Sequence, residues 1–258
     1  MAGNPTMDDH FSHVASSYRQ IRQTDAEPIL FISERLNDLP HVQAADVGCG
    51  AGRYDLLLFR HVKNLHLTCI DLNESMLQQV SDYLTRHHVS RFETLRANGV
   101  EGQHTIHRLV VEGNLIAVHH FDLVGFLENA VRVSKPGGKI FIYTRLRSQN
   151  ARNVWGRHFP SFTKKETRLY ELDELDVAIR AVEGVRLERV EPFHYRRKAT
   201  VAQLVERVRA RHYSTFSLYA EDELNSALER FQASLKREFH EIVEWVDENT
   251  LLVLDRVN

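Results

Sequence analysis

The stretch ADVGCGAGRY, residues 45–54, decides how the rest of the chain is interpreted. It places Gly48, Gly50 and Gly52 within five residues, although the 258-residue chain has only 12 glycines. Glycine weakens helices and strands because it loses more backbone freedom on folding than any other residue. The cluster therefore indicates a backbone that turns sharply, or one that another group approaches closely.

The sequence on either side of this turn predicts a strand, the turn and then a helix. The run VQAADVG at 42–48 is typical of a buried strand, and RYDLLLFRHV at 53–62 is typical of a helix. A second expected strand, at 65–72, carries Asp71 near its end. Helix N-termini favour anions, and an acid after the next strand can accept hydrogen bonds from ribose hydroxyls. The pattern predicts a nucleotide-like ligand at the turn.

Strand and helix patterns alternate up to Arg145, which indicates parallel βαβ units and an α/β fold. The remaining expected elements of this part are helices at 9–39, 73–88 and 122–134 and strands at 91–97, 107–113 and 139–145. Beyond Arg145 the alternation ends. Expected strands at 185–195 and 245–257 there flank a long helical segment. We expect insertions at approximately 147–184 and 197–240 to form a helical cap over the strand ends, within one domain of 1–258.

The glycine spacing distinguishes two classes of nucleotide site. A dinucleotide turn has the pattern G-x-G-x-x-G, and its third glycine would fall at Arg53, where a bulky side chain stands. The spacing here is G-x-G-x-G. DVGCGAGR at 46–53 resembles motif I of the class I S-adenosylmethionine-dependent methyltransferases.

Three further stretches extend this resemblance. CIDLNESML at 69–77 resembles the second motif of the family, and AVRVSKPGGKIFI at 130–142 resembles the stretch that leads into its fifth strand. VASSYRQIR at 14–22 resembles the N-terminal helix of the small-molecule branch, which includes the ubiquinone and menaquinone methylases. The resemblance implies a Rossmann-like, seven-stranded sheet with helices on both faces, whose last strands form a reversed hairpin.

The resemblance also implies the cofactor, S-adenosyl-L-methionine, and the residues that bind it. Asp71 would bind the ribose, Leu72 and Met76 would lie beside the adenine, and Tyr18 would reach the methionine carboxylate. Asn114 matches the position that faces the methyl donor. The complete expected set is Tyr18, Asp46, Gly48, Gly50, Gly52, Asp71, Leu72, Met76, Asn98, Gly99 and Asn114.

Methyl transfer from a sulfonium is an in-line displacement, so the protein mainly holds the acceptor in line and excludes water. A base helps only where the acceptor must lose a proton. His119 and His120 follow the expected fourth strand and are the candidate catalytic residues, the alternative being solvated or packed histidines. The candidate substrate-binding residues are Arg145, Trp155, Tyr170 and Tyr213. The alternative for Trp155, Phe159 and Phe216, and the one that the pattern favours, is that they form the core of the cap.

The composition limits the remaining possibilities. Hydrophobic residues make up 43% of the chain and charged residues 26%, a balance typical of soluble proteins. The net charge of −2 gives no overall attraction to nucleic acid or to an anionic membrane. Two cysteines without metal-ligand spacing predict neither a disulfide framework nor a metal site, and favour a reducing compartment. The absence of a signal-peptide pattern and of a long apolar run leads us to expect a cytoplasmic protein.

Two alternatives to a small-molecule methyltransferase stay open. Basic runs at 145–157 and 196–211 favour a tRNA methyltransferase, although the sequence contains no recognised RNA-binding module. A non-catalytic S-adenosylmethionine-binding protein would carry the same glycine turn and the same Asp71.

Overall fold

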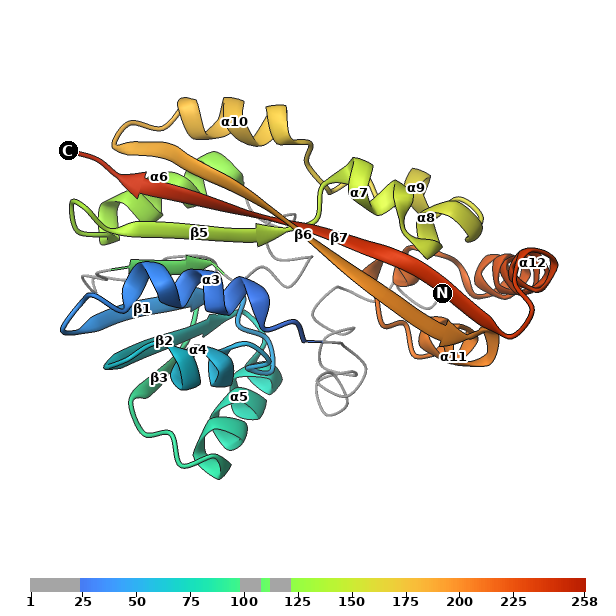
Figure 1. Ribbon diagram of the computed structural model, residues 1–258, viewed down its shortest axis with the longest axis horizontal. Helices are drawn as coiled ribbons and strands as arrows, with labels where there is room; N and C mark the ends of the chain where they lie inside the picture. The colour runs from blue at the N-terminus through green and yellow to red at the C-terminus, as the bar shows by residue number, and fades with distance from the viewer. Residues whose placement is uncertain (1–23, 98–107, 112–121) are drawn as a thin grey trace, which may run out of the picture. The chain divides into compact units, whose positions relative to one another are not determined.

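The computed structural model describes residues 24–97, 108–111 and 122–258. Its strands are β1 (Val42–Val47), β2 (Leu65–Asp71), β3 (Phe92–Arg96), β4 (Arg108–Val111), β5 (Lys139–Thr144), β6 (Val185–Thr200) and β7 (Ile242–Arg256). Its longer helices are α3 (Glu27–Leu36), α4 (Asp55–His61), α5 (Glu74–Arg86), α6 (Leu123–Val133), α10 (Leu172–Arg180), α11 (Val201–Arg209) and α12 (Glu221–Glu238). Short helices α7 (Arg147–Arg152), α8 (Val154–His158), α9 (Phe162–Lys165) and η2 (Ser214–Leu218) complete the described elements (Figure 1).

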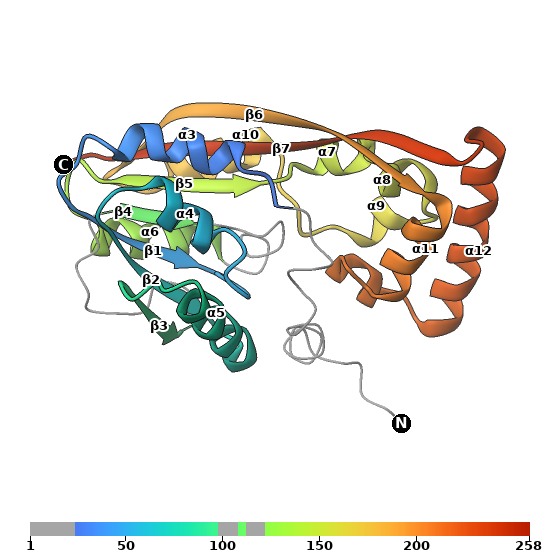
Figure 2. The ribbon, with the colours of Figure 1, turned by 60° about the horizontal axis from the view of Figure 1, so that its bottom comes forward.

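The strands form a sheet in the order β3-β2-β1-β4-β5-β7-β6. Strands β1 to β5 pair in parallel, and β7 pairs antiparallel to β5 in a register that sets Lys139 opposite Asp255. Figure 2 shows α4 in front of the parallel strands and α6 behind them. The expected α/β class, with a parallel sheet and an antiparallel strand near the C-terminus, is confirmed.

The strand order reverses at β1, because the chain continues to β2 on one side and later returns to β4 on the other. Ligands of open α/β sheets bind beyond the carboxyl ends of the strands at such a reversal. The glycine turn of residues 48–52 directly follows β1. The fold therefore places this turn where a ligand is expected.

The chain divides into two compact units. The sheet unit comprises Met1–Thr144, Leu172–Glu191 and Thr250–Asn258, and the helical unit comprises Arg145–Glu171 and Pro192–Asn249. Strands β6 and β7 contribute residues to both units. The expected cap segments include residues of both units, and their placement over the strand ends stays a prediction.

Local sequence explains where the main helices begin and end. Asn73 caps α5 by accepting a hydrogen bond from the backbone N–H of Met76 at 3.1 Å, as its position predicts. At α11, Thr200 and Gln203 satisfy each other's backbone N–H groups in a capping box. Helix α12 has three acids in its first turn and Lys236 and Arg237 in its last, which complements the helix dipole.

Three element boundaries differ from the sequence-based expectations. Of the helix expected at 9–39, the part up to residue 23 lies outside the described residues; beyond it, α3 covers only Glu27–Leu36, with a proline in its first turn. Strand β6 continues to Thr200, five positions beyond the expected end, and β7 begins at Ile242 rather than at Trp245. Polar residues dominate the β6 extension, which hides its period from a search for apolar runs, whereas the β7 extension, Ile242–Glu244, is too short to show a period.

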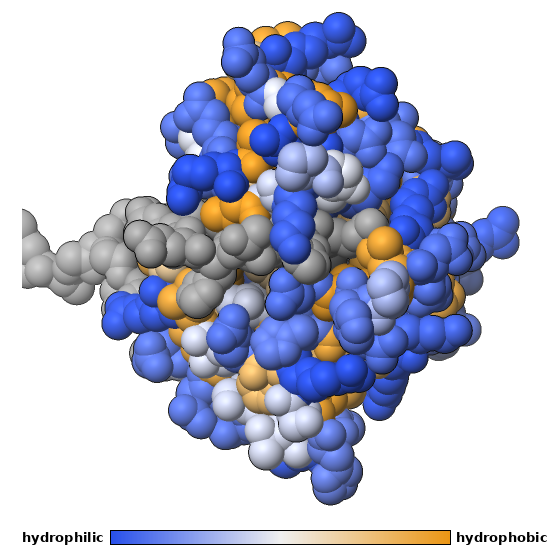
Figure 3. All heavy atoms as spheres, turned by 90° about the vertical axis from the view of Figure 1, so that its left-hand side faces the viewer, coloured by the Kyte–Doolittle hydropathy of each residue, from blue (hydrophilic) through white to orange (hydrophobic). Residues whose placement is uncertain are grey.

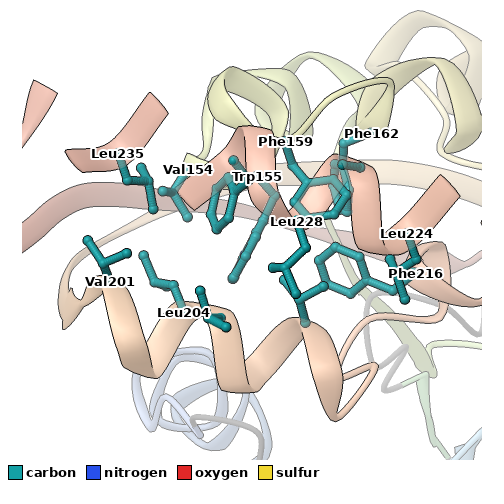
Figure 4. Packing of buried hydrophobic residues seen from close by; sticks show 14 of the residues in the cluster. Val154, Trp155, Phe159, Phe162, Val201, Leu204, Phe216, Leu224, Leu228 and Leu235 are labelled. Carbon is teal, nitrogen blue, oxygen red and sulfur yellow. The ribbon is translucent and has the colours of Figure 1, made fainter. Parts of the chain in front are cut away.

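The helical unit has its own core, built from α8, α11, α12 and the segment around Phe216. Trp155 is 2% exposed and stacks on Phe231 with 5.2 Å between ring centroids, while its ring meets that of Phe216 edge-on at 5.4 Å. Figure 4 shows the side chains of Trp155, Phe159 and Phe216 pointing toward one another. The helical periodicity of Leu224, Leu228, Phe231 and Leu235 is explained by their burial in this core.

Candidate cofactor site

The glycine turn adopts the backbone conformation that its composition predicts. Gly48, Gly50 and Gly52 have φ values of 79°, 55° and 77°, a region that other residues rarely occupy. The backbone N–H groups of Gly48 and Cys49 donate to the carbonyl of Ile70 at 2.7 and 3.0 Å. The turn is thereby fixed to the end of β2, and its glycines leave it without side chains that would cover a ligand.

Asp71 joins the turn to the start of α5. Its Oδ2 accepts a hydrogen bond from the Gly50 N–H at 2.9 Å, and its Oδ1 accepts one from the Asn73 N–H at 2.9 Å. A carboxylate oxygen can accept more than one hydrogen bond, so Asp71 retains the capacity to bind ribose hydroxyls. The carboxylate therefore fits the expected ribose contact and also braces the turn.

Leu72 and Met76, the two residues expected beside the adenine, differ in exposure. Leu72 is 50% exposed, which makes it one of the large apolar side chains that the described surface offers to a ligand. Met76 is 1% exposed and packs inside the sheet unit, as Val80 and Leu84 of the same helix do. Of the two, Leu72 is the side chain that a ligand can reach in this structure, and both contacts stay predictions.

The third glycine serves packing within the protein. A Cβ atom added to Gly52 would lie 2.4 Å from Cγ2 of Val80 on α5, closer than any side chain permits. Gly52 thus allows the turn to contact α5 directly. The glycine cluster indicated a close approach in the sequence, and the approaching group is α5.

A buried polar cluster lies at the base of the turn. Asp46 and Asp55 are both fully buried. Sγ of Cys69 donates to Oδ1 of Asp55 at 3.6 Å. Burial raises the pKa of Asp55 to about 6 and raises that of the Cys49 thiol. Asp55 was not among the residues expected at the site; its sequence signal is an acid followed directly by the apolar run Leu56–Phe59.

The candidate substrate-binding residues with described positions lie in the helical unit. Arg145 is 2% exposed and donates to Asn249 Oδ1, the Glu248 carbonyl and the Tyr213 hydroxyl, each at 3.2 Å. Tyr213 is half-buried against the core, and Trp155 is part of that core. Tyr170 is also half-buried, and its carbonyl accepts from the Arg147 N–H at 3.0 Å. The structure brings Arg145, Trp155 and Tyr213 together, and Arg145 there is already engaged by the protein.

Six site residues expected from the sequence lie outside the described residues: Tyr18, Asn98, Gly99, Asn114, His119 and His120. Among the residues that are described, no group of three or more His, Cys, Asp or Glu side chains could hold a metal ion. None of the helices in the same part of the chain is long and apolar enough to cross a membrane.

Residues 44–138 match the family model described as a methyltransferase domain. The matched region begins in β1 and includes the glycine turn, Asp71 and α6. This region is a class I S-adenosylmethionine-dependent methyltransferase domain, so the expected enzyme class and methyl donor are confirmed. The positive-φ glycines and the Asp71 carboxylate fit such a donor. The search of curated proteins found no match to the chain.

Solved structures share the fold at low sequence identity. The mycolic acid cyclopropane synthase CmaA1, solved with S-adenosylhomocysteine, has a TM-score of 0.60 at 13% identity, covering 97% of this chain and 99% of the other. Geranyl diphosphate C-methyltransferase from Streptomyces coelicolor A3(2) has a TM-score of 0.51 at 13% identity, with 88% and 76% covered. The [4+2]-cyclase SpnF has a TM-score of 0.62 at 15% identity, with 98% and 97% covered. The cyclase shows that this fold also supports other chemistry.

Proposed function

We propose that this methyltransferase transfers the methyl group of S-adenosylmethionine to a small organic acceptor by in-line displacement. The observation that carries the proposal is that acids of the helical unit engage five arginines of the two basic runs: Arg145, Arg152, Arg197, Arg209 and Arg211. Those runs were the sequence feature that favoured a nucleic-acid acceptor. Binding to RNA requires cations that can reach phosphates.

The ion pairs within the helical unit are specific. Arg152 contacts both carboxylate oxygens of Glu248, at 2.9 and 2.6 Å. Asp247 contacts Arg145 at 3.3 Å and Arg197 at 3.4 Å, and both arginine side chains are at most 10% exposed. Arg209 and Arg211 pair near the surface with Glu206 and Glu221. Moving Arg145 or Arg197 away from Asp247 would leave an uncompensated buried charge. These two arginines are therefore unavailable to phosphates.

Similar structures support a small acceptor. Their names include geranyl diphosphate and mycolic acid, both molecules with a large apolar part. We infer that the acceptor here is of comparable chemistry, and the motif at 14–22 favours the ubiquinone and menaquinone methylase branch within that class. The seven-stranded sheet with a closing reversed hairpin belongs to the same proposal.

The donor, when bound, supplies a methyl group already activated by its sulfonium. The chain then has to hold the donor, orient the acceptor and exclude water. We assign donor holding to the glycine turn and Asp71. Proton removal, where the acceptor requires it, is assigned to His119.

The test is a transfer assay with radiolabelled S-adenosylmethionine and four acceptor panels: phenols and quinols, amines, carboxylic acids and prenyl diphosphates. Bulk tRNA is the fifth arm, measured at several salt concentrations. We expect label in at least one small-molecule panel and tRNA binding without a steep salt slope. Transfer to tRNA alone would overturn the proposal. Donor binding without transfer in any arm would favour the non-catalytic alternative.

A further inference from the structure

Arg53 is the first residue after the glycine turn, and its side chain lies against an aromatic ring. The guanidinium carbon Cζ is 4.4 Å from the centroid of the Tyr54 ring, which is the geometry of a cation–π contact. Tyr54 is 2% exposed, whereas Arg53 is only partly buried. The contact therefore holds a positive charge beside the turn and leaves part of the arginine accessible.

The contacts of Tyr54 show on which side of β1 this charge lies. The Tyr54 ring meets the ring of Tyr143 on β5 edge-on, with 6.1 Å between the ring centroids. In the strand order of the sheet, β5 lies on one side of β1 and β2 lies on the other. Asp71, at the end of β2, accepts a hydrogen bond from the Gly50 N–H of the same turn. The turn is thus flanked by a carboxylate on the β2 side and by the stacked Arg53 and Tyr54 toward the β5 side.

The two ends of S-adenosylmethionine differ in the same way. One end is an adenosine, whose ribose offers hydroxyl groups, and the other end is an amino acid with a carboxylate. A donor whose ribose binds Asp71 would extend from the β2 side across the positive-φ glycines, which carry no side chains to obstruct it. Its amino-acid end would then lie on the β5 side of the turn, where Arg53 supplies a cation.

We propose that Arg53 binds the carboxylate of the methyl donor and so fixes the amino-acid end of S-adenosylmethionine. A guanidinium presents its N–H groups in a planar fork that matches a carboxylate, and such charge-assisted hydrogen bonds are about twice as strong as neutral ones. Stacking on Tyr54 already restricts the arginine, so little side-chain freedom is lost on binding. The contact expected from Tyr18 is compatible with this one, because a carboxylate accepts several hydrogen bonds. The proposal concerns the donor and holds for any acceptor.

The test compares two donors that differ only in the carboxylate: S-adenosylmethionine and decarboxylated S-adenosylmethionine. Calorimetric titration of the full chain without an acceptor measures their binding independently of turnover. Arg53→Met removes the cation but keeps a side chain that can pack on Tyr54, and Arg53→Lys keeps a charge without the planar fork. Arg35→Met is the matched control, because the Arg35 guanidinium also stacks on a ring, that of Phe31 at 3.5 Å, on α3 of the same unit.

For the wild type and Arg35→Met we expect the decarboxylated donor to bind about tenfold to a hundredfold more weakly than S-adenosylmethionine. Arg53→Met should lose that factor for S-adenosylmethionine and less than twofold for the decarboxylated donor, so that the preference disappears. Arg53→Lys should retain part of the preference. Equal weakening of both donors in Arg53→Met would give Arg53 a purely structural role and overturn the proposal, as would an unchanged preference in that variant. Should Arg53→Met not fold, the full wild-type preference in Arg53→Lys would overturn it.

Discussion

Asp71 combines two tasks in one carboxylate, and its replacement tests both. Asp71→Ala removes the expected ribose contact and the acceptor for the N–H groups of Gly50 and Asn73. We expect S-adenosylhomocysteine to bind more weakly by about 1–3 kcal/mol, as calorimetry measures it. Asp71→Asn keeps one acceptor oxygen and should lose less. Unchanged affinity in a folded Ala variant would exclude Asp71 as the ribose partner.

The raised pKa of Asp55 predicts that its contribution to the free energy of unfolding falls as the pH rises, the opposite of acid denaturation. Because its pKa is raised from 3.8 to about 6, the folded chain favours the protonated form. This contribution to stability is complete below pH 3.8 and is lost as the pH rises through about 6. Asp55→Asn, neutral throughout, should therefore be more stable than wild type at pH 8, by up to about 3 kcal/mol, and by less at pH 5. Urea unfolding at the two pH values measures the difference. An equal difference at both would contradict the raised pKa.

His119 remains a prediction from sequence position. If it accepts a proton from the acceptor, His119→Ala should slow turnover by about 10²–10⁴-fold while donor affinity stays unchanged. His120→Ala is the control, because adjacent side chains do not both point into one pocket. Equal, small losses in both variants would leave proximity as the source of catalysis and favour an acceptor that is already a good nucleophile.

Residue types with a fixed geometric purpose could be predicted from the sequence. The glycine cluster indicated a turn with positive φ values. Asp71 could be assigned because it lies at the end of the next strand, one βα unit after the turn. The surroundings of Asp55 could not be found this way, because its burial and its hydrogen bond from Cys69 arise only in the folded chain. Arg145 was expected to bind substrate, because a basic residue in a sequence shows no partner. In the structure its guanidinium contacts Asp247, Asn249 and Tyr213.

At the scale of elements, the contact between the turn and α5 gives a direct test. Gly52→Ala combines backbone strain, about 1–3 kcal/mol, with overpacking against Val80. Gly137→Ala has nearly the same φ, 75°, but its new Cβ would meet nothing within 4 Å. We expect Gly52→Ala to be the more destabilised in urea unfolding.

The double variant Gly52→Ala/Val80→Ala should recover part of the excess loss, because the smaller side chain relieves the contact but not the strain. Equal losses of stability in Gly52→Ala and Gly137→Ala would show that α5 moves away from the added Cβ atom without a cost in free energy.

Elements of the parallel sheet were predictable because buried strands and amphipathic helices repeat with clear periods. The β6 extension was not, since its polar residues carry little periodic signal, and the β7 extension, Ile242–Glu244, is too short to show a period. Residues 172–180 were expected within a cap, yet α10 packs against α6 in the sheet unit. That assignment depends on contacts between distant segments, which spacing alone cannot specify.

At the scale of the whole molecule, the two units should respond separately to a core mutation. Trp155→Ala removes the largest fully buried side chain and should cost about 3–5 kcal/mol in unfolding. Donor affinity should change less than twofold, because the glycine turn belongs to the sheet unit. Leu218→Ala, at a position 39% exposed, is the control. A large loss of S-adenosylhomocysteine affinity in a folded Trp155→Ala variant would contradict this independence.

On the face that Figure 3 shows, hydrophobic side chains form small separate areas among hydrophilic ones. This face therefore presents no large apolar surface for a partner. The composition predicted this balance. The division into two units was less accessible, because each unit is assembled from separate stretches of chain.

Strand β7 supplies Val243 to the helical core and Leu251–Leu254 to the sheet unit, without interruption. Side chains alternate along a strand, so a shift by one residue moves every one of them to the opposite face. The pairing of Thr250 with Thr144 and of Asp255 with Lys139 therefore fixes the face of the strand on which each side chain of β7 lies. An insertion of one residue at 249–250 would turn many side chains of β7 to the opposite face at once. The same insertion at 239–241, before the strand, leaves the alternation of side chains along β7 unchanged. We expect the number of residues in β7 to tolerate less variation than the identity of most of them.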